Sequence, residues 1–450
     1  MAKGNTMRVL DLRGTSLSSI ELNQELPRAA VDITKAIEQI QPLLLDVKNR
    51  GIDAVIDVAL KFDGVDPQPL KVGTEELAAA LKALDAELRE SIEESIARVR
   101  AVSEANLPEA IEVEFSRGAK VLQRWRAVDS VGLYVPGGKA VYPSSVIMNV
   151  VPAQVAGVNR LVIATPAQKD FNGRPHPTVL ATAALLGVDE VLCVGGPAAI
   201  AAFAYGLPQI DFEPVNLVCG PGNIYVAAAK RALRGIIGID SEAGTTEIMV
   251  IADETANPEF IAYDLVSQAE HDEAAASVLV TDSTELAQKV QLSVSAAAAR
   301  TAHSERVFTA LSGQQSAIVL VDSIGQAVRV ANDYATEHLE IQTENPHAVL
   351  AAISNAGAIF LGNYSPVSLG DYMAGSNHVL PTGQQAKFGS GLGVHTFLRA
   401  QQVIDYSESG LAELAKKVER FAAAEGLPAH GDAVAVRFSS APSLPSTEES

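Results

Sequence analysis

Residues 217–225, LVCGPGNIY, combine a short apolar run, a turn with two glycines and the first residues of an Ala-rich segment, which is the pattern of a strand, a turn and a helix. The first N–H groups of such a helix are free and can hold a pyrophosphate. Gly220 and Gly222 supply half of the dinucleotide-binding fingerprint, but Tyr225 stands where its third glycine belongs. A tight structural turn explains the same pattern, so the stretch predicts an α/β unit and leaves its ligand open.

The same alternation continues on both sides of this stretch. Short apolar runs are separated by Ala-rich segments such as residues 179–186, 198–204 and 224–233, which read as helices. Buried apolar strands that alternate with helices are typical of parallel sheets with helices on both faces. The strands fall into two groups, which predicts two doubly wound, incomplete Rossmann-like sheets. The expected strands cover residues 130–135, 160–164, 190–194, 216–219, 247–252, 277–281 and 317–321.

Helical patterns also lie outside the two sheets. Residues 31–49 and 74–104 repeat apolar side chains at helical spacing or are rich in helix formers, and residues 411–424 read as a helix. The Ser-, Pro- and Glu-rich residues 439–450 have the composition of a disordered tail. The expected fold class is therefore α/β, with a helical N-terminal region and a small C-terminal helical segment.

Composition limits the possible partners. The 450 residues contain 34 Lys and Arg against 54 Asp and Glu, a net charge of −20, which disfavours nucleic acids and anionic membranes. No apolar run is long enough to predict a transmembrane helix, and residues 1–15 lack the apolar core of a signal peptide. Cys193 and Cys219 cannot form a disulfide framework, so a reducing cytoplasm is expected.

Several polar side chains have the spacing of metal ligands. Gln268 and His271 are three residues apart on a predicted helix and can converge on one point, although a solvated polar flank has the same spacing. Asp371 and His378 lie in a glycine-rich stretch, residues 363–393, of the kind that carries binding residues. With His430 these residues offer nitrogen and oxygen donors and no thiolate, which suits Zn²⁺ with an open position.

Two further pairs combine a carboxylate with an imidazole. Glu337 and His338 begin a strand-like run, and a histidine beside a carboxylate suits acid–base chemistry. Neighbours in a regular strand point to opposite faces, so a surface pair at a strand start is the alternative. Glu425 and His430 lie beside a helix end, where a capping or exposed pair is the alternative.

Taken in order, these segments resemble the histidinol dehydrogenase family. The match runs from about Val128 to about His430, roughly two-thirds of the chain. Most of the segments are weak signals by themselves, but together, at these separations, they are highly specific. They are VGLYVPGGKAVYPSSV at 131–146, CGPGN at 219–223, IDSEAGTTE at 239–247, QAEHD at 268–272, EHLE at 337–340, GDYMAGSNHVLPT at 370–382 and EGLPAH at 425–430.

The resemblance implies an enzyme that depends on zinc and NAD and oxidises L-histidinol to L-histidine, through an aldehyde, in two hydride transfers. It makes Glu337 and His338 the acid–base pair. The implied zinc ligands are Gln268, His271, Asp371 and His430. The implied substrate contacts are Thr246, Gln268, His271, His338, Asp371, His378, Glu425 and His430, and the implied NAD contacts are Tyr134 and Asn223.

The resemblance also implies a domain organisation and a homodimer in which Glu425 and His430 act in the partner's site. Two residues depart from the family pattern: Thr246 replaces the usual serine, and Ala198 stands where a glutamine often contacts the nucleotide. The expected parts are an N-terminal arm (1–30), a first α/β domain (31–128 and 240–385), a second α/β domain (129–239), a C-terminal dimer-exchange segment (386–438) and a disordered tail (439–450).

Two other functions fit the same residues. A zinc hydrolase would use the four donors to make a metal hydroxide, with the glycine turns merely structural. A nucleotide- or metabolite-binding module would carry the polar pairs only as surface groups and would have no need of an acid–base pair. Formation of NADH from L-histidinol distinguishes the dehydrogenase from both.

Overall fold

The structure, a computed structural model, describes residues 7–29, 33–137, 141–242 and 244–439 of the chain. Residue contacts divide it into two compact units, which are described separately. The first unit comprises Met1–Leu107 and Val128–Phe397, and the second comprises Pro108–Ala127 and Leu398–Ser450. Most of the tail expected at 439–450, residues 440–450, lies outside the described residues.

The first unit contains a six-stranded parallel sheet, here called the first sheet. Its central strands are completely buried, which explains why they appear in the sequence as continuous apolar runs. From β9 to β13 the strands follow the 3-2-1-4-5 arrangement of a doubly wound fold, and β1 joins the edge beside β11. The full order is β1 (Arg8–Asp11), β11 (Ala317–Leu320), β10 (Ala276–Thr281), β9 (Glu247–Ala252), β12 (His338–Gln342) and β13 (Ala358–Leu361).

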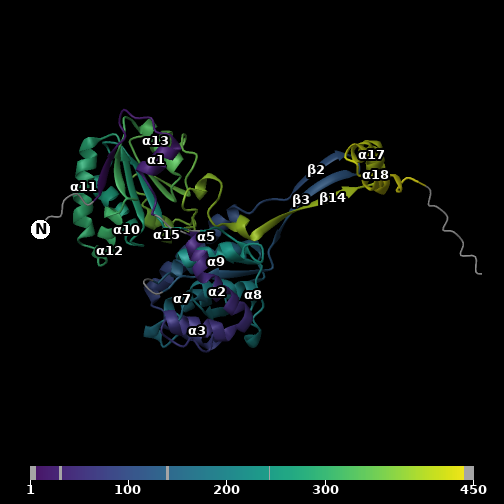
Figure 1. The fold of residues 1–450 in the computed structure, drawn as a ribbon, viewed down its shortest axis with the longest axis horizontal. Coiled ribbons are helices and arrows are strands. Elements are labelled where there is room, and N and C mark those ends of the chain that lie inside the picture. The colour runs from purple at the N-terminus through teal and green to yellow at the C-terminus, as the bar shows by residue number, and fades with distance from the viewer. Residues whose placement is uncertain (1–6, 30–32, 138–140, 243, 440–450) are drawn as a thin grey trace, which may run out of the picture. The chain divides into compact units, whose positions relative to one another are not determined.

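Helices cover both faces of this sheet (Figure 1). Side chains of β9 alternate between the two cores: Ile248 and Val250 face one, while Met249 and Ile251 face the other. One core is closed by α10 (Pro258–Ala269), α11 (Thr284–Ala298) and α12 (Ser304–Ser312). The opposite core is closed by α1 (Ser19–Glu25), α13 (Ile324–Tyr334) and α14 (Pro346–Leu350), and α15 (Val367–Tyr372) follows β13.

A five-stranded parallel sheet, here called the second sheet, repeats the 3-2-1-4-5 order within the same unit. Its order is β6 (Glu190–Cys193), β5 (Arg160–Thr165), β4 (Ser130–Tyr134), β7 (Leu217–Cys219) and β8 (Gly238–Ile239). The helices between its strands are α6 (Pro143–Ala156), α7 (Pro177–Leu185), α8 (Gly196–Tyr205) and α9 (Ile224–Leu233). The prediction of two doubly wound sheets is thus confirmed. The unit also contains short 3₁₀ helices at Lys169–Phe171, Pro208–Ile210, Gln385–Lys387 and Val394–Phe397.

The N-terminal helices pack against a different sheet from the one that the expected domain organisation gave them. Residues 31–128 were expected to join 240–385, but Ile40, Leu44 and Val55 share a core with α8, α9 and the second sheet. The amphipathic pattern of these helices identifies an apolar face and not the sheet that it covers. The helices are α2 (Ile33–Arg50), α3 (Ile52–Phe62), α4 (Thr74–Ala83) and α5 (Ala86–Ala105), of which α4 contacts α7 and α5 contacts α6.

The second unit is a three-stranded antiparallel sheet followed by short helices. Residues 111–116 and 119–127 are strands that were not predicted, although their side chains alternate between apolar and polar. The sheet order is β14 (Leu398–Tyr406), β3 (Ala119–Ala127) and β2 (Ile111–Ser116). The helices are α16 (Glu408–Ala412), α17 (Ala415–Ala424) and α18 (Pro428–Ala435).

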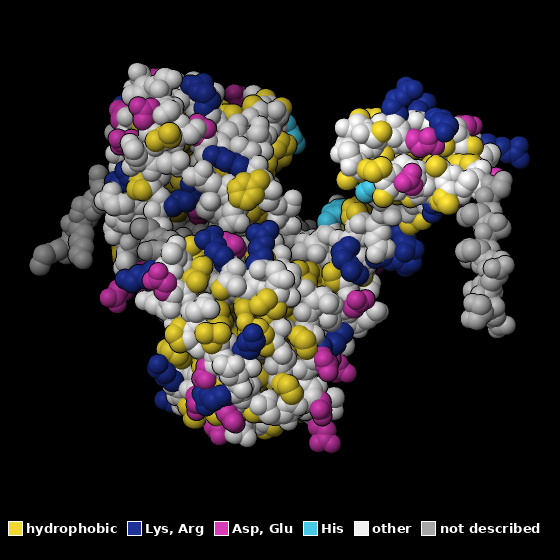
Figure 2. All heavy atoms as spheres, turned by 45° about the vertical axis from the view of Figure 1, so that its right-hand side comes forward, with side chains coloured by type: hydrophobic (Ala, Val, Ile, Leu, Met, Phe, Trp, Pro, Cys, Tyr) yellow, Lys and Arg dark blue, Asp and Glu magenta, His cyan; other side chains and the backbone are white. Residues whose placement is uncertain are grey.

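Neither unit offers a helix that could cross a bilayer: within the described ranges, none is both long and apolar enough. Lys and Arg side chains are interspersed with Asp and Glu on the face shown in Figure 2.

Candidate active site

The Glu337–His338 pair lies buried at the amino edge of the first sheet, where β12 begins beside β9. The Thr246 hydroxyl and the Glu247 N–H both donate to Oε2 of Glu337, at 2.5 and 2.9 Å. Nδ1 of His338 lies 3.1 Å from the Glu247 carbonyl oxygen. A carbonyl oxygen only accepts, so Nδ1 carries the hydrogen and Nε2 keeps the lone pair of a base.

The side chains of Glu337 and His338 lie close together because Glu337 precedes the regular part of β12, which begins at His338. Oε2 of Glu337 lies only 3.4 Å from Nδ1 of His338. The two side chains therefore do not point to opposite faces of the sheet, as neighbours in a regular strand do. Both are buried, so they do not form a pair on the surface. Burial raises the pKa of Glu337 to about 8 and lowers that of His338, so both groups are neutral near pH 7.

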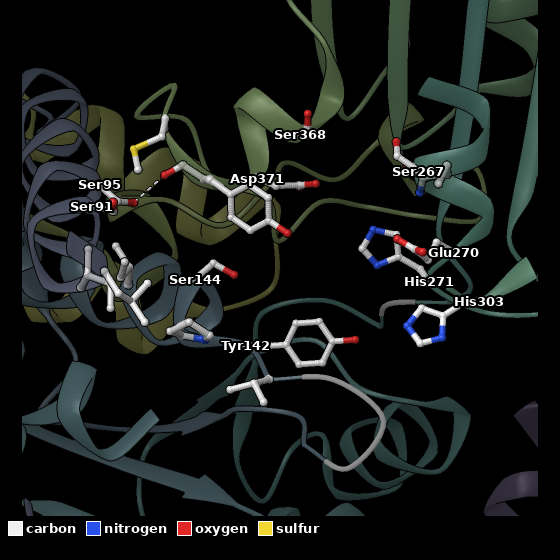
Figure 3. Close-up of a pocket in the computed structure, with 18 of the residues that line it drawn as sticks. Ser91, Ser95, Tyr142, Ser144, Ser267, Glu270, His271, His303, Ser368 and Asp371 are labelled. Atoms are coloured by element: carbon white, nitrogen blue, oxygen red, sulfur yellow. Dashed lines mark hydrogen bonds between the residues drawn. The ribbon is translucent and has the colours of Figure 1, made fainter. Parts of the chain in front are cut away.

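Three of the expected zinc ligands line one cavity of about 720 Å³. His271, which follows the end of α10, and Asp371 of α15 extend into it and point toward one another (Figure 3). Gln268 is buried in the wall, and its amide nitrogen donates to the Thr246 hydroxyl. The side chain of His271 is open to the cavity, yet desolvation by the surrounding protein lowers its pKa and keeps the imidazole neutral.

The other walls of the cavity come from α5, α12 and the start of α6. Tyr142 and Ser144 follow the carboxyl end of β4, while His303 lies across from them near α10 (Figure 3). Arg306 of α12 lines the same cavity. The cavity therefore lies where the carboxyl edge of the second sheet meets the amino edge of the first. Residues from both sheets can act on one bound molecule there.

His378 lies beside Asp371 and is held by the protein at both ring nitrogens. Nδ1 is 3.2 Å from the Asp371 carbonyl oxygen, and Nε2 is 3.3 Å from the Ser145 hydroxyl. Burial lowers the pKa of His378 to about 4. Its neutral ring thus connects the segment after α15 to α6.

Glu425 and His430 belong to the second unit, where both are exposed at the end of α17 and in α18. The first unit by itself brings together three of the four expected ligands, Gln268, His271 and Asp371. In the part of the chain that the structure describes, no three His, Cys, Asp or Glu side chains are grouped to hold a metal ion.

The two expected NAD contacts lie at the carboxyl edge of the second sheet. Tyr134 ends β4, and its hydroxyl accepts a hydrogen bond of 3.0 Å from the Gly196 N–H. Asn223 caps α9 by accepting from the N–H groups of Tyr225 and Val226. This edge, between β4 and β7, is the switch point of the strand order, where doubly wound folds bind ligands.

The turn between β7 and α9 requires glycine. Gly220 has a φ of +115°, and a Cβ there would lie 2.1 Å from the carbonyl oxygen of Tyr134. The buried pair of Lys230 and Asp240 holds the turn: Lys230 donates to the Gly220 carbonyl, and Asp240 accepts from the Gly220 N–H. Ala198 is buried within α8 and presents no polar group at this edge.

No role was predicted from the sequence for Glu247, Arg28 or the cavity residues Tyr142, His303 and Arg306. A charged residue at the first position of the apolar strand 247–252 was the available signal for Glu247. No local pattern distinguishes Arg28, because its importance arises from a partner 219 residues away.

Both sheets have the strand order of nucleotide-dependent dehydrogenases, and the buried acid–base pair beside the cavity suits removal of a hydroxyl proton. The fold and site thus define an α/β oxidoreductase of dehydrogenase type. The family model described as histidinol dehydrogenase matches residues 26–438. The chain belongs to the histidinol dehydrogenase family.

Individual relatives agree with this assignment. A histidinol dehydrogenase of Bifidobacterium longum (strain NCC 2705) is 56% identical over 442 residues, which cover 96% of this chain and 94% of the relative. One of Leifsonia xyli subsp. xyli is 53% identical over 432 residues, covering 96% and 99%. The crystal structure of histidinol dehydrogenase from Elizabethkingia anophelis matches with a TM-score of 0.89 at 31% identity, covering 97% of this chain and 99% of that one.

Proposed function

We propose that the protein oxidises L-histidinol to L-histidine with NAD and a zinc ion, in two hydride transfers through L-histidinaldehyde. Family membership supports the substrate. The observation that carries the proposal is the fixed tautomer of His338, whose Nδ1 is held by the Glu247 carbonyl while Nε2 is left as a base.

The donor set of the cavity fits a zinc ion. Gln268 binds Thr246 through its amide nitrogen, which leaves its carbonyl oxygen as a ligand; His271 offers a neutral imidazole, and Asp371 offers a carboxylate. Nitrogen and oxygen donors of this kind suit Zn²⁺, and three protein ligands leave room for a fourth from His430. When bound, zinc orients the amino alcohol and stabilises negative charge on its oxygen.

His338 serves both oxidation steps. In the first, Nε2 takes the hydroxyl proton of histidinol while a hydride leaves its carbon for NAD, which gives the aldehyde. His338 releases this proton to solvent before the second step. There the ionised form of Glu337 takes a proton from the water that adds to the aldehyde, and the neutral His338 takes the remaining hydroxyl proton of the hydrate as the second hydride leaves. Because a general base works best when its pKa is near the working pH, the raised pKa of Glu337 suits this role.

NAD is expected at the carboxyl edge of the second sheet. The positive end of the α9 dipole favours its pyrophosphate, and Tyr134 and Asn223 lie at the same edge. Thr246 retains the hydroxyl of the usual family serine, and Glu337 and Gln268 already engage it.

The second unit is proposed to form the homodimer and to supply Glu425 and His430 to the partner's site. In and beside α17 and α18 it exposes Phe421, Leu427, Val436 and Phe438, and hydrophobic side chains are visible on the surface of this unit in Figure 2. Exposed apolar patches of this kind mark protein interfaces. A reducing cytoplasm is the proposed location, since Cys193 and Cys219 are both free and buried.

Zinc-dependent NADH formation tests the proposal. The purified protein is incubated with L-histidinol and NAD, before and after removal of metal with a chelator, and NADH is followed by absorbance. The expected result is a rate that the chelator abolishes and zinc restores. Hydrolysis of esters or amides without NADH would instead support a zinc hydrolase, and binding of either ligand without turnover would support a binding module.

A further inference from the structure

Arg28 reaches from the segment before α2 into the buried start of β9. Its Nε lies 2.6 Å from Oε1 of Glu247, whose side chain is only 2% exposed. A second nitrogen of the guanidinium donates to the carbonyl of Tyr334, and the group lies 3.8 Å from the centre of the Tyr334 ring. Arg28 is therefore fixed by an ion pair, a hydrogen bond and a cation–π contact at once.

Glu247 is the residue whose backbone holds both members of the acid–base pair. Its N–H donates to Glu337, and its carbonyl accepts from His338. A displacement of Glu247 therefore moves the carboxylate and the imidazole together, and it removes the bond that fixes the tautomer of His338.

Glu247 needs a positive partner to stay in this place. Its carboxyl group is buried close to another buried carboxyl group, that of Glu337. Burial raises the pKa of Glu247 to about 7, while the positive charge of Arg28 lowers this pKa. Among the described residues, Oε1 receives, apart from the bond of Arg28, only a 3.3 Å hydrogen bond from the Gly383 N–H, and Oε2 has no hydrogen-bond partner. Loss of one partner of such a buried pair is strongly unfavourable, because it leaves an uncompensated charge.

We propose that Arg28 is a positioning residue for catalysis: its charge holds Glu247 at the start of β9, so that the Glu247 backbone fixes Glu337 and His338 for proton transfer. This inference rests on the proposed function. It gives a role to the N-terminal segment, none of whose described residues lines the cavity.

Five proteins test the inference: the parent, Arg28→Met, Arg28→Lys, the double variant Arg28→Met/Glu247→Gln, and Arg13→Met. The last removes an exposed arginine that is paired with Asp11 before α1, also in the N-terminal region, and serves as the matched control. For each, kcat and the KM values for L-histidinol and NAD are measured, together with zinc content and melting temperature.

We expect kcat of Arg28→Met to fall about 10- to 100-fold, because a misplacement of about 1 Å can cost on the order of 10²-fold. Both KM values and the zinc content stay near those of the parent, since Arg28 contacts neither the cavity nor the glycine turn. Arg28→Lys keeps the charge and stays within about threefold of the parent. The double variant removes both buried charges and recovers to within about threefold, because a neutral residue 247 needs no counter-charge.

Distinct outcomes would overturn the inference. A double variant or an Arg28→Lys variant whose kcat falls as far below that of the parent as is expected for Arg28→Met would show that charge on this segment does not position the pair. Because both comparisons are with the parent, they hold even if Arg28→Met itself does not fold. Full kcat in Arg28→Met would do the same while leaving the proposed function intact. A parent protein that makes no NADH from L-histidinol would overturn the proposed function and this inference with it.

Discussion

Individual hydrogen bonds decide the chemistry of Glu337 and His338. Adjacent residues in a strand normally separate to opposite faces, but these two share the backbone of Glu247 on the neighbouring strand. The sequence identified the pair as a candidate. It could not show that the pair is buried, because burial depends on β9, which begins 90 residues earlier.

Replacement of His338 by Asn tests the assignment of the base. The amide fills much of the same space and cannot take up a proton, so we expect kcat to fall about 10²- to 10⁴-fold. Zinc content should stay unchanged, because His338 is not among the proposed ligands. Turnover is followed as NADH and zinc by metal analysis; a His338→Asn variant that turns over at the parental rate would remove His338 from the mechanism.

The raised pKa of Glu337 predicts a pH dependence of the aldehyde step. Below its pKa of about 8 the carboxyl group is protonated and cannot act as a base, so the rate of histidinaldehyde oxidation should rise as the pH increases through about 8. Glu337→Gln should lose this rise and run about 10²- to 10⁴-fold slower. Stopped-flow rates with L-histidinaldehyde measure both, and an unchanged profile in the Gln variant would argue against this role.

At the scale of elements, the two sheets place their candidate functional residues at opposite edges, the carboxyl edge in the second sheet and the amino edge in the first. In the second sheet the glycine turn follows the carboxyl ends of β4 and β7, as is usual for doubly wound folds. In the first sheet the acid–base pair lies at the amino ends of β9 and β12. The cavity between these edges draws its walls from α5, α6, α10, α12 and α15.

The turn before α9 yields a prediction about the nucleotide. Gly220→Ala places a methyl group against the Tyr134 carbonyl and in a backbone conformation that alanine disfavours. We expect KM for NAD to rise about tenfold or more, while KM for L-histidinol changes little. Gly73→Ala is the matched control, since nothing lies within 4 Å of its Cβ position; equal effects in the two variants would contradict a nucleotide site at this turn.

Elements differed in how well the sequence predicted them. The central strands of both sheets were predicted because full burial gives continuous apolar runs. Strands β2, β3 and β14 were missed because they are exposed or only partly buried, apart from Ala119, and carry charged side chains. The prediction that α2 and α3 pack with the first sheet was wrong, because an amphipathic face does not specify the sheet against which it packs.

At the scale of the whole molecule, the proposed dimer makes a prediction by subunit mixing. If His430 acts in the partner's site, a dimer of one His430→Ala and one His338→Asn subunit has one intact site. Random exchange makes about half of the dimers mixed, so an equal mixture should regain about a quarter of the parental activity. Each variant alone serves as the control, and a mixture no more active than these controls would show that His430 does not act across the interface.

The most direct test of the central claim is the number of NADH molecules formed from each L-histidinol when the zinc-loaded protein runs to completion with excess NAD. One buried acid–base pair that serves both oxidations predicts two NADH and quantitative L-histidine. One NADH with accumulated L-histidinaldehyde, or no NADH, would contradict the account.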